Sequence, residues 1–123
     1  MNKNLSLTAF LGFLAIALGA FGAHALKEKL GVDGLKTFET GVRYQMYHVL
    51  LLIFINTYTG FSSKVKNTLS ILFFIGILCF SGSLYAITAG GIAAKSIWYI
   101  TPLGGLFLLI GWLTLGYQFT KRN

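Results

Sequence analysis

The sequence predicts an all-α integral membrane protein with four transmembrane helices in an up-down-up-down bundle. Charged residues make up only 11% of its 123 residues, against about 25% in a typical soluble domain. Four stretches also lack Asp, Glu, Lys and Arg, at positions 4–26, 44–63, 67–94 and 96–120. Each reaches the roughly 20 residues that a helix needs to cross a bilayer. The connections between the stretches are short, which favours antiparallel neighbours and hence the up-down-up-down order. We expect the four spans to form a single domain over residues 1–123.

Charge and cysteine content exclude several other classes of protein. The net charge of +7 is spread over connections and termini, whereas nucleic-acid-binding proteins gather basic residues in a patch or stripe. Cys79 is the only cysteine, which excludes an intramolecular disulfide and a Cys/His metal motif. Lys and Arg beside apolar spans orient helices and contact anionic headgroups. We therefore expect the lipid bilayer as a partner, and no nucleic acid.

The first span is expected at about 5–26. Lys3 before an apolar run that ends in Ala23-His24-Ala25 also resembles a signal peptide. A transmembrane helix is favoured because small residues recur at intervals of three and four, which lines one helix face and lets another backbone approach closely. These residues are Gly12, Ala15, Gly19 and Gly22.

The first connection, 27–34, is predicted to be a polar turn with Gly31 and Gly34 as breakers. Asp33 is a suitable N-cap for a second helix. Apolar and charged side chains lie on opposite faces of 35–43, which indicates an amphipathic lead-in at the membrane interface.

The remaining spans are expected at about 42–58, 69–88 and 97–119. Pro102 falls in the first turns of the last span, where a missing amide N–H costs least. The third span repeats the small-residue spacing of the first, so we expect these two spans to be the tightly packed helices. Its small residues are Gly76, Cys79, Ser83 and Ala86.

The count of Lys and Arg does not by itself fix the orientation of the protein in the membrane, because five of these residues fall on each side of the bundle. Lys36 and Arg43 belong to the interfacial helix rather than to a free loop. This favours cytoplasmic termini.

Placed by depth, the polar side chains gather in the half of the bundle opposite the termini. His48 should face the interior, because an unpaired imidazole is costly in hydrocarbon, with Tyr85, Ser81 or His24 as its partner. Two interpretations stay open: a proton-relay or small-ligand pocket, and a hydrogen-bond network that fixes helix register. The candidate cluster is His24, Arg43, Tyr44, Gln45, His48, Ser81, Ser83, Tyr85 and Thr101.

Catalytic and metal-binding motifs are absent from the sequence. It has no glycine-rich phosphate loop, nucleophile elbow or His-Glu-x-x-His pattern. Two histidines, His24 and His48, without a carboxylate or thiolate nearby are a weak signal for a metal or haem. Ser81 or Ser83 with His48 as base would make an intramembrane hydrolase, but serines on a small-residue stripe are more typical of packing. We predict no catalytic, cofactor-binding or metal residue, and no enzyme.

Four motifs occur in series along the whole chain: GAFGAHAL at 19–26, GVRYQMYH at 41–48, FSGSLY at 80–85, and ITPLGG at 100–105 followed by Gly111-Trp112. Together they resemble the YgdD/YwdK family, small membrane proteins that carry a domain of unknown function and have animal relatives. The resemblance implies four transmembrane helices and residence in a bacterial inner membrane, and it carries no activity. The positions that match are His24, Tyr44, Gln45, His48, Ser81, Gly82, Ser83, Tyr85, Thr101, Pro102 and Gly104.

The sequence is compatible with two kinds of function. The first is a non-enzymatic accessory or packing subunit of a membrane complex, or a homo-oligomer, because the glycine stripes and short loops offer little to a soluble substrate. The alternative is a small channel or transporter for protons or a small solute, with the polar half of the bundle as its vestibule.

Overall fold

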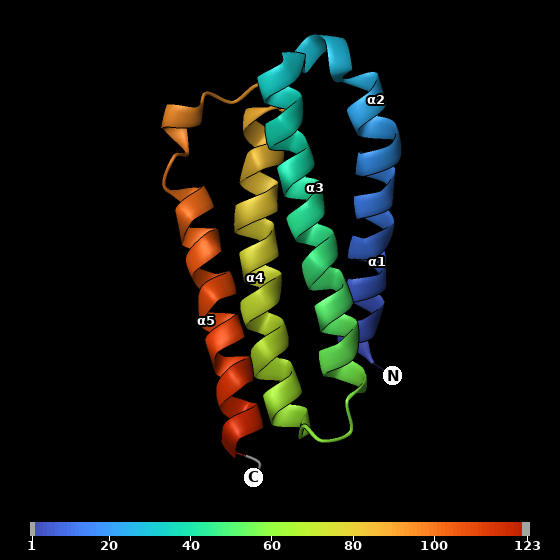
Figure 1. Cartoon of the computed structure of the whole chain (residues 1–123), viewed down its shortest axis with the longest axis vertical. Helices are drawn as coiled ribbons and strands as arrows, with labels where there is room; N and C mark the ends of the chain where they lie inside the picture. The colour runs from blue at the N-terminus through green and yellow to red at the C-terminus, as the bar shows by residue number, and fades with distance from the viewer. Residues whose placement is uncertain (1, 122–123) are drawn as a thin grey trace.

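Four long helices form the fold, and each runs antiparallel to the one before it (Figure 1). The computed structural model describes residues 2–121, and no strand occurs within them. A π-helical turn, Leu18–Gly22, joins the first two helical segments into one continuous rod, and a 3-10 turn, Ala94–Ser96, precedes the last helix. The α-helices are α1 (Lys3–Ala17), α2 (Ala23–Ala25), α3 (Lys27–Thr57), α4 (Ser63–Ile87) and α5 (Ile100–Lys121). The all-α prediction is confirmed.

Three of these rods are long and apolar enough to cross a membrane: Lys3–Ala25, Ser63–Ile87 and Ile100–Lys121. Helix α3 has 31 residues and is therefore long enough, but polar residues such as Gln45 and His48 lower the apolarity of its middle. The first and last described residues lie at the same end of the bundle (Figure 1). Below, this end is called the terminal end.

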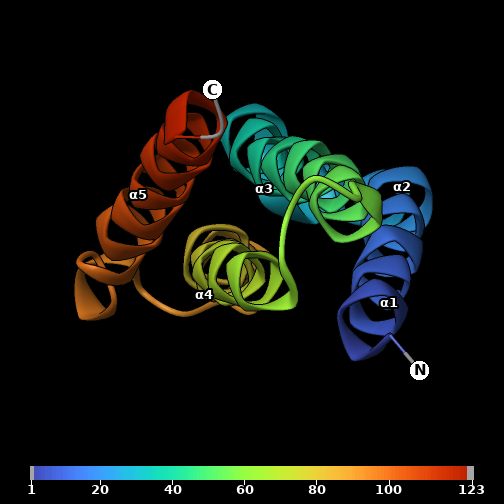
Figure 2. The ribbon, with the colours of Figure 1, turned by 90° about the horizontal axis from the view of Figure 1, so that it is seen from below.

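The helices are arranged with α3 and α4 in the middle, α1 against α3, and α5 against α4 (Figure 2). The prediction that the first and third spans form the tightly packed pair is wrong. The glycines of the first span instead lie against α3, where a Cβ atom on Gly19 would be 3.1 Å from Val42 and one on Gly22 would be 3.2 Å from Phe38. Small residues allow close approach by any helix, and they do not specify which helix approaches.

The small residues of α4 face α5, where the two backbones come closest. A Cβ atom on Gly76 would lie 2.5 Å from Leu108, and one on Gly111 would lie 2.7 Å from Phe73. A Cβ atom on Gly104 would collide with the α4 backbone at Phe80. Apolar side chains fill the middle of the bundle beside this interface: Leu52, Ile55, Phe61, Leu69, Phe73, Ile77, Leu108 and Leu115.

The first connection differs from the predicted turn, because helix begins again already at Lys27 and is interrupted only at Gly31. Gly31 adopts a φ of 72°, a backbone conformation that glycine reaches without strain. Helix resumes directly afterwards, so Asp33 and Gly34 lie inside it rather than before it. The amphipathic character of 35–43 is visible in the structure: Phe38 is buried, whereas Lys36, Glu39 and Arg43 are exposed.

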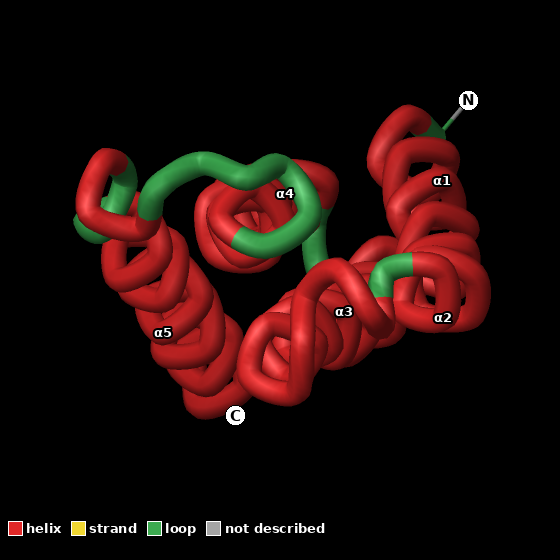
Figure 3. Tube along the Cα trace, turned by 90° about the horizontal axis from the view of Figure 1, so that it is seen from above, coloured by secondary structure: helices red, strands yellow, loops and turns green. Residues whose placement is uncertain are grey.

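The connection between α4 and α5 runs along the opposite end of the bundle, together with the corner between α2 and α3 (Figure 3). The chain turns there at Gly91, whose φ is 70°. Helix α5 then begins at Ile100, three residues later than expected, and Pro102 occupies its first turn as predicted.

Candidate functional site

The predicted polar cluster does not form one site. His24 on α2 and Arg43 on α3 are exposed, and Arg43 Nη2 donates a hydrogen bond to Thr40 on its own helix at 3.2 Å. They do not converge with His48 on a common cavity. The other seven residues fall into separate groups: one around Gln45 joins α1, α3 and α4, one around Ser83 joins α4 and α5, and one around His48 joins α3 and α5.

Gln45 connects three helices. Its side chain is 3% exposed; Nε2 donates to the Leu11 carbonyl of α1 at 2.7 Å, and Oε1 accepts from the Tyr85 hydroxyl of α4 at 2.7 Å. Nearby, Ser81 Oγ donates to the Gly41 carbonyl at 2.6 Å, which ties α4 to α3 a second time. Such bonds hold helices in register within hydrocarbon.

Ser83 and Thr101 form a separate group, in which their hydroxyls share a hydrogen bond between α4 and α5. Ser83 Oγ also contacts the Phe80 carbonyl at 2.9 Å. The hydroxyls of Ser81 and Ser83 are thus both hydrogen-bonded to neighbouring residues, and neither is hydrogen-bonded to the His48 imidazole.

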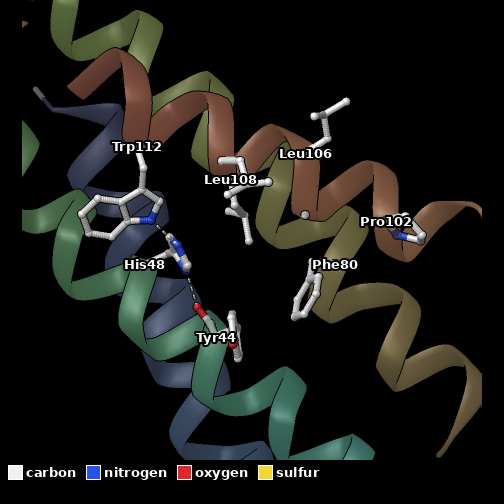
Figure 4. A pocket seen from close by; sticks show the side chains of 9 residues that line it. Tyr44, His48, Phe80, Pro102, Leu106, Leu108 and Trp112 are labelled. Atoms are coloured by element: carbon white, nitrogen blue, oxygen red, sulfur yellow. Dashed lines mark hydrogen bonds between the residues drawn. The ribbon is translucent and has the colours of Figure 1, made fainter. Parts of the chain in front are cut away.

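His48 has partners that the sequence did not indicate. Its Nδ1 lies 2.7 Å from the Tyr44 carbonyl, and its Nε2 accepts a hydrogen bond from Trp112 Nε1 at 3.0 Å (Figure 4). The predicted partners Tyr85, Ser81 and His24 are wrong. An indole N–H in an apolar surrounding needs an acceptor, and this requirement is the signal that could have paired Trp112 with a buried imidazole.

These two bonds assign the protonation of the ring. A carbonyl only accepts, so Nδ1 carries the hydrogen and donates to Tyr44, and the Nε2 lone pair accepts from Trp112. The imidazole is then neutral, with both nitrogens used inside the protein. In this arrangement His48 has no lone pair for a metal and no free nitrogen to accept a proton from a substrate.

A cavity of about 460 Å³ lies beside His48 between α3 and α5, with one wall from α4. It opens sideways, since Trp112 is 49% exposed and Leu109 is 64% exposed on the outer surface of α5. Figure 4 shows the His48 and Trp112 rings next to each other at one side of the pocket, joined by their hydrogen bond. We call it the α3/α5 pocket, and its lining consists of Tyr44, His48, Phe80, Pro102, Gly105, Leu106, Leu108, Leu109 and Trp112. Its lining is almost wholly apolar, so it suits an apolar group from within the bilayer plane.

The terminal end carries a second polar network that depth alone did not reveal. Asn4 Nδ2 donates to Asn56 Oδ1 at 3.0 Å and to Asn67 Oδ1 at 2.9 Å. Asn56 Nδ2 donates to the Leu52 carbonyl and to Ser70 Oγ, each at 2.9 Å. Asn56 and Ser70 are both buried. The prediction that the polar side chains gather in the half opposite the termini is therefore wrong, because a second group lies at the terminal end. We call these four side chains (Asn4, Asn56, Asn67 and Ser70) the asparagine network.

Comparison with known proteins places this bundle in a family. The model of the family described as "Protein of unknown function (DUF423)" matches residues 18–105. The chain belongs to the DUF423 family. A UPF0382 membrane protein of Haemophilus influenzae is 41% identical over 122 residues, which cover 99% of this chain and 97% of that protein. No solved structure matches the chain.

Two further relatives confirm the family resemblance inferred from the motifs. The UPF0382 membrane protein YwdK of Bacillus subtilis is 40% identical, over 94% of both chains. The UPF0382 inner membrane protein YgdD of Escherichia coli is 34% identical, over 88% of this chain and 82% of its own. This DUF423 chain is thus a membrane protein. The matched region contains Gln45 and His48, but it ends before Trp112, the hydrogen-bond partner of His48.

Proposed function

We propose that this DUF423 protein crosses the inner membrane four times, with cytoplasmic termini, and acts without catalysis by binding another membrane protein surface in the plane of the bilayer. The occupant is a subunit of a larger complex or a second copy of the chain. Of the four proposed spans, helix α3 is the least favourable to place in hydrocarbon, because it is less apolar than the other three. Its polar side chains Gln45 and His48 are buried and paired, so crossing exposes neither of them to hydrocarbon.

The α3/α5 pocket is the observation that carries the proposal. It is concave, lined mainly by apolar groups, and bordered by large exposed side chains at the depth of the helix middles. A transmembrane partner gains from packing into such a concavity, because helix association in lipid depends on van der Waals contact. Gly12, Gly19 and Gly22 of the first rod, and Gly76, Gly104 and Gly111 at the α4–α5 interface, are already packed against neighbours inside the bundle. These glycines are therefore not free to bind a partner helix, whereas the α3/α5 pocket is open.

The packing of the centre favours this role over a proton or solute pathway through one bundle. Leu52, Phe73 and Leu108 belong to the buried cluster that fills the middle. The polar groups are divided between the α1 side, around Gln45, and the α5 side, around His48. A hydrolase has less support still, since Ser81 donates to Gly41 and His48 is bonded to Trp112.

Site-specific photocrosslinking in cells tests the proposal. A photoreactive residue at Leu109, which lines the pocket, is expected to give one discrete protein adduct. The same residue at Phe13, which is 66% exposed on the lipid face of α1, serves as the matched control and is expected to react with lipid only. An adduct of twice the chain mass identifies a second copy, and any other discrete mass identifies a different subunit.

A pocket-filling variant sharpens the test. A Cβ atom on Gly105 has Phe80 as its nearest neighbour at 3.9 Å, and one on Gly116 has nothing within 4 Å. Gly105→Leu therefore fills the pocket without a backbone collision, whereas Gly116→Leu adds the same side chain to a different part of α5. We expect Gly105→Leu to suppress the Leu109 adduct and Gly116→Leu to leave it unchanged. Lipid-only adducts at both positions of the unfilled protein contradict the proposal.

A further inference from the structure

A groove runs between α1 and α4, on a different face from the α3/α5 pocket. Its cavity measures about 400 Å³. Helix α1 contributes Leu7, Leu11, Leu14 and Leu18, which are spaced to line one helix face. The facing wall comes from α4, and the Gln45 side chain of α3 lies at the groove as well. On α4 the apolar lining residues are Phe74, Ile77 and Leu78. Gln45 and Tyr85 are the polar side chains among the lining residues.

A second, polar cavity of about 390 Å³ lies between the same two helices at the terminal end. It comes one turn before Leu7 on α1 and two turns before Phe74 on α4. Its lining combines two lysines, the three asparagines of the asparagine network and two neighbouring polar residues: Asn2, Lys3, Asn4, Asn56, Ser63, Lys66 and Asn67. Polar and apolar cavities thus follow one another along one pair of helices.

The charge of the polar cavity is uncompensated within the described residues. Neither the Lys3 nor the Lys66 ammonium group has a hydrogen-bond or ion-pair partner in residues 2–121. The three carboxylates of the chain, Glu28, Asp33 and Glu39, all belong to the opposite end, where α3 begins (Figure 1). Two ammonium groups beside amide and hydroxyl groups are suited to a phosphate group.

We propose that this pair of cavities binds one anionic phospholipid, with its phosphate between Lys3 and Lys66 and an acyl chain along the groove. The position supports a lipid over a soluble phosphate, because the apolar groove follows the polar cavity along the same two helices, one turn further along α1. From Asn4 to Leu18, α1 rises about 21 Å at roughly 1.5 Å per residue. One leaflet contributes about half of a hydrocarbon core of roughly 30 Å, so the groove is long enough for one acyl chain. The proposal is independent of the α3/α5 pocket.

Native mass spectrometry of the protein released from nanodiscs tests the site. Nanodiscs of phosphatidylglycerol are compared with nanodiscs of phosphatidylcholine, and retained lipid is counted per protein. The test variant is Lys3→Gln with Lys66→Gln. The matched control is Lys64→Gln with Lys121→Gln, which removes the same charge at the same end of the bundle but outside the polar cavity.

We expect the wild type to retain one phosphatidylglycerol and little phosphatidylcholine. Each lysine near a membrane surface contributes on the order of 1 kcal/mol to the binding of anionic lipid, so the test variant is expected to bind at least about tenfold more weakly. The control is expected to stay within about twofold of the wild type, a change of under roughly 0.5 kcal/mol. Unchanged binding by the test variant, or an equal loss in both variants, overturns the site.

Two further arms separate the sources of phosphate and test the groove. Inorganic phosphate is added to detergent-solubilised protein; binding that depends on Lys3 and Lys66 without lipid overturns the lipid assignment in favour of a soluble ligand. Gly82 lines the groove, and a Cβ atom there has only Leu78 nearby, at 4.0 Å. Gly82→Leu, with folding checked by circular dichroism, is expected to lose the retained lipid, whereas Gly116→Leu keeps it. Full retention by folded Gly82→Leu contradicts the acyl-chain assignment.

Discussion

Replacing Gly104 by alanine is expected to destabilise the bundle, although alanine is the better helix former. Gly104 lies on α5, where its backbone meets α4, and an added Cβ atom would lie 2.8 Å from the Cys79 carbonyl carbon and 2.8 Å from its Cβ atom. It would also collide with the Phe80 backbone nitrogen. Backbone atoms cannot move aside as a side-chain end can, so α4 and α5 must separate.

The size of the expected loss in unfolding free energy follows from a comparison of Gly104→Ala with Gly116→Ala on the same helix. Both changes gain the helix propensity of alanine over glycine, about 1 kcal/mol. A Cβ atom on Gly116 meets nothing within 4 Å, so Gly116→Ala is expected to stabilise by up to that amount. Overpacking a close interface costs roughly 1–3 kcal/mol. The difference in unfolding free energy between the two variants isolates this collision, and we expect Gly104→Ala to be about 1–3 kcal/mol less stable than Gly116→Ala.

Reversible unfolding in mixed micelles of dodecyl maltoside and sodium dodecyl sulfate, followed by circular dichroism, measures both variants. A Gly104→Ala protein as stable as Gly116→Ala refutes the close approach of α4 and α5. The same result would also remove the physical reason for small residues along this face of α4.

The hydrogen bonds between helices give further predictions, measurable in the same unfolding assay. Tyr85→Phe loses one bond to Gln45 and is expected to cost about 0.6 kcal/mol, the average for such bonds in membrane proteins. Gln45→Leu also removes the bond to α1 and is expected to cost more, roughly 1–3 kcal/mol; equal losses would contradict the bridge to α1. Trp112→Phe is expected to cost about 1 kcal/mol and to shift the imidazole resonances of His48 in NMR spectra, whereas unchanged resonances would refute their contact. Asn56→Leu removes the centre of the asparagine network and should cost roughly 1–3 kcal/mol, and a neutral effect would show that the network contributes nothing.

Much of the fold could be predicted because membrane crossing depends on local composition. The helical rods follow the uncharged stretches, and Pro102 and Gly91 mark ends that local backbone chemistry sets. The choice of neighbours could not be predicted this way. Gly19 permits close approach by any helix, and only the complete packing shows that Val42 of α3 is the side chain that fills the space above it.

The candidate site could be predicted only in part, because burial follows from local composition whereas hydrogen-bond partners depend on helix packing. The sequence predicts that His48 faces the interior and is paired, because a polar side chain in hydrocarbon needs a partner, and it places Gln45 in the candidate cluster without naming a partner for it. Their actual partners, Trp112 and the Leu11 carbonyl, depend on helix rotation and on which helices are adjacent. A backbone carbonyl has no signature in the sequence at all, so the bond from Gln45 to Leu11 was beyond prediction.

Both proposals rest on α3 crossing the membrane together with the three more apolar rods, and labelling of single cysteines tests this most directly. In a Cys79→Ser background, cysteine is placed at three exposed positions, Val32, Thr59 and Ala93. A membrane-impermeant maleimide is applied to intact cells and to inverted vesicles. Four crossings predict that Val32→Cys and Ala93→Cys react from the periplasmic side, and that Thr59→Cys reacts from the cytoplasmic side. Labelling of Val32→Cys and Thr59→Cys from the same side would show that α3 does not cross and would contradict the account.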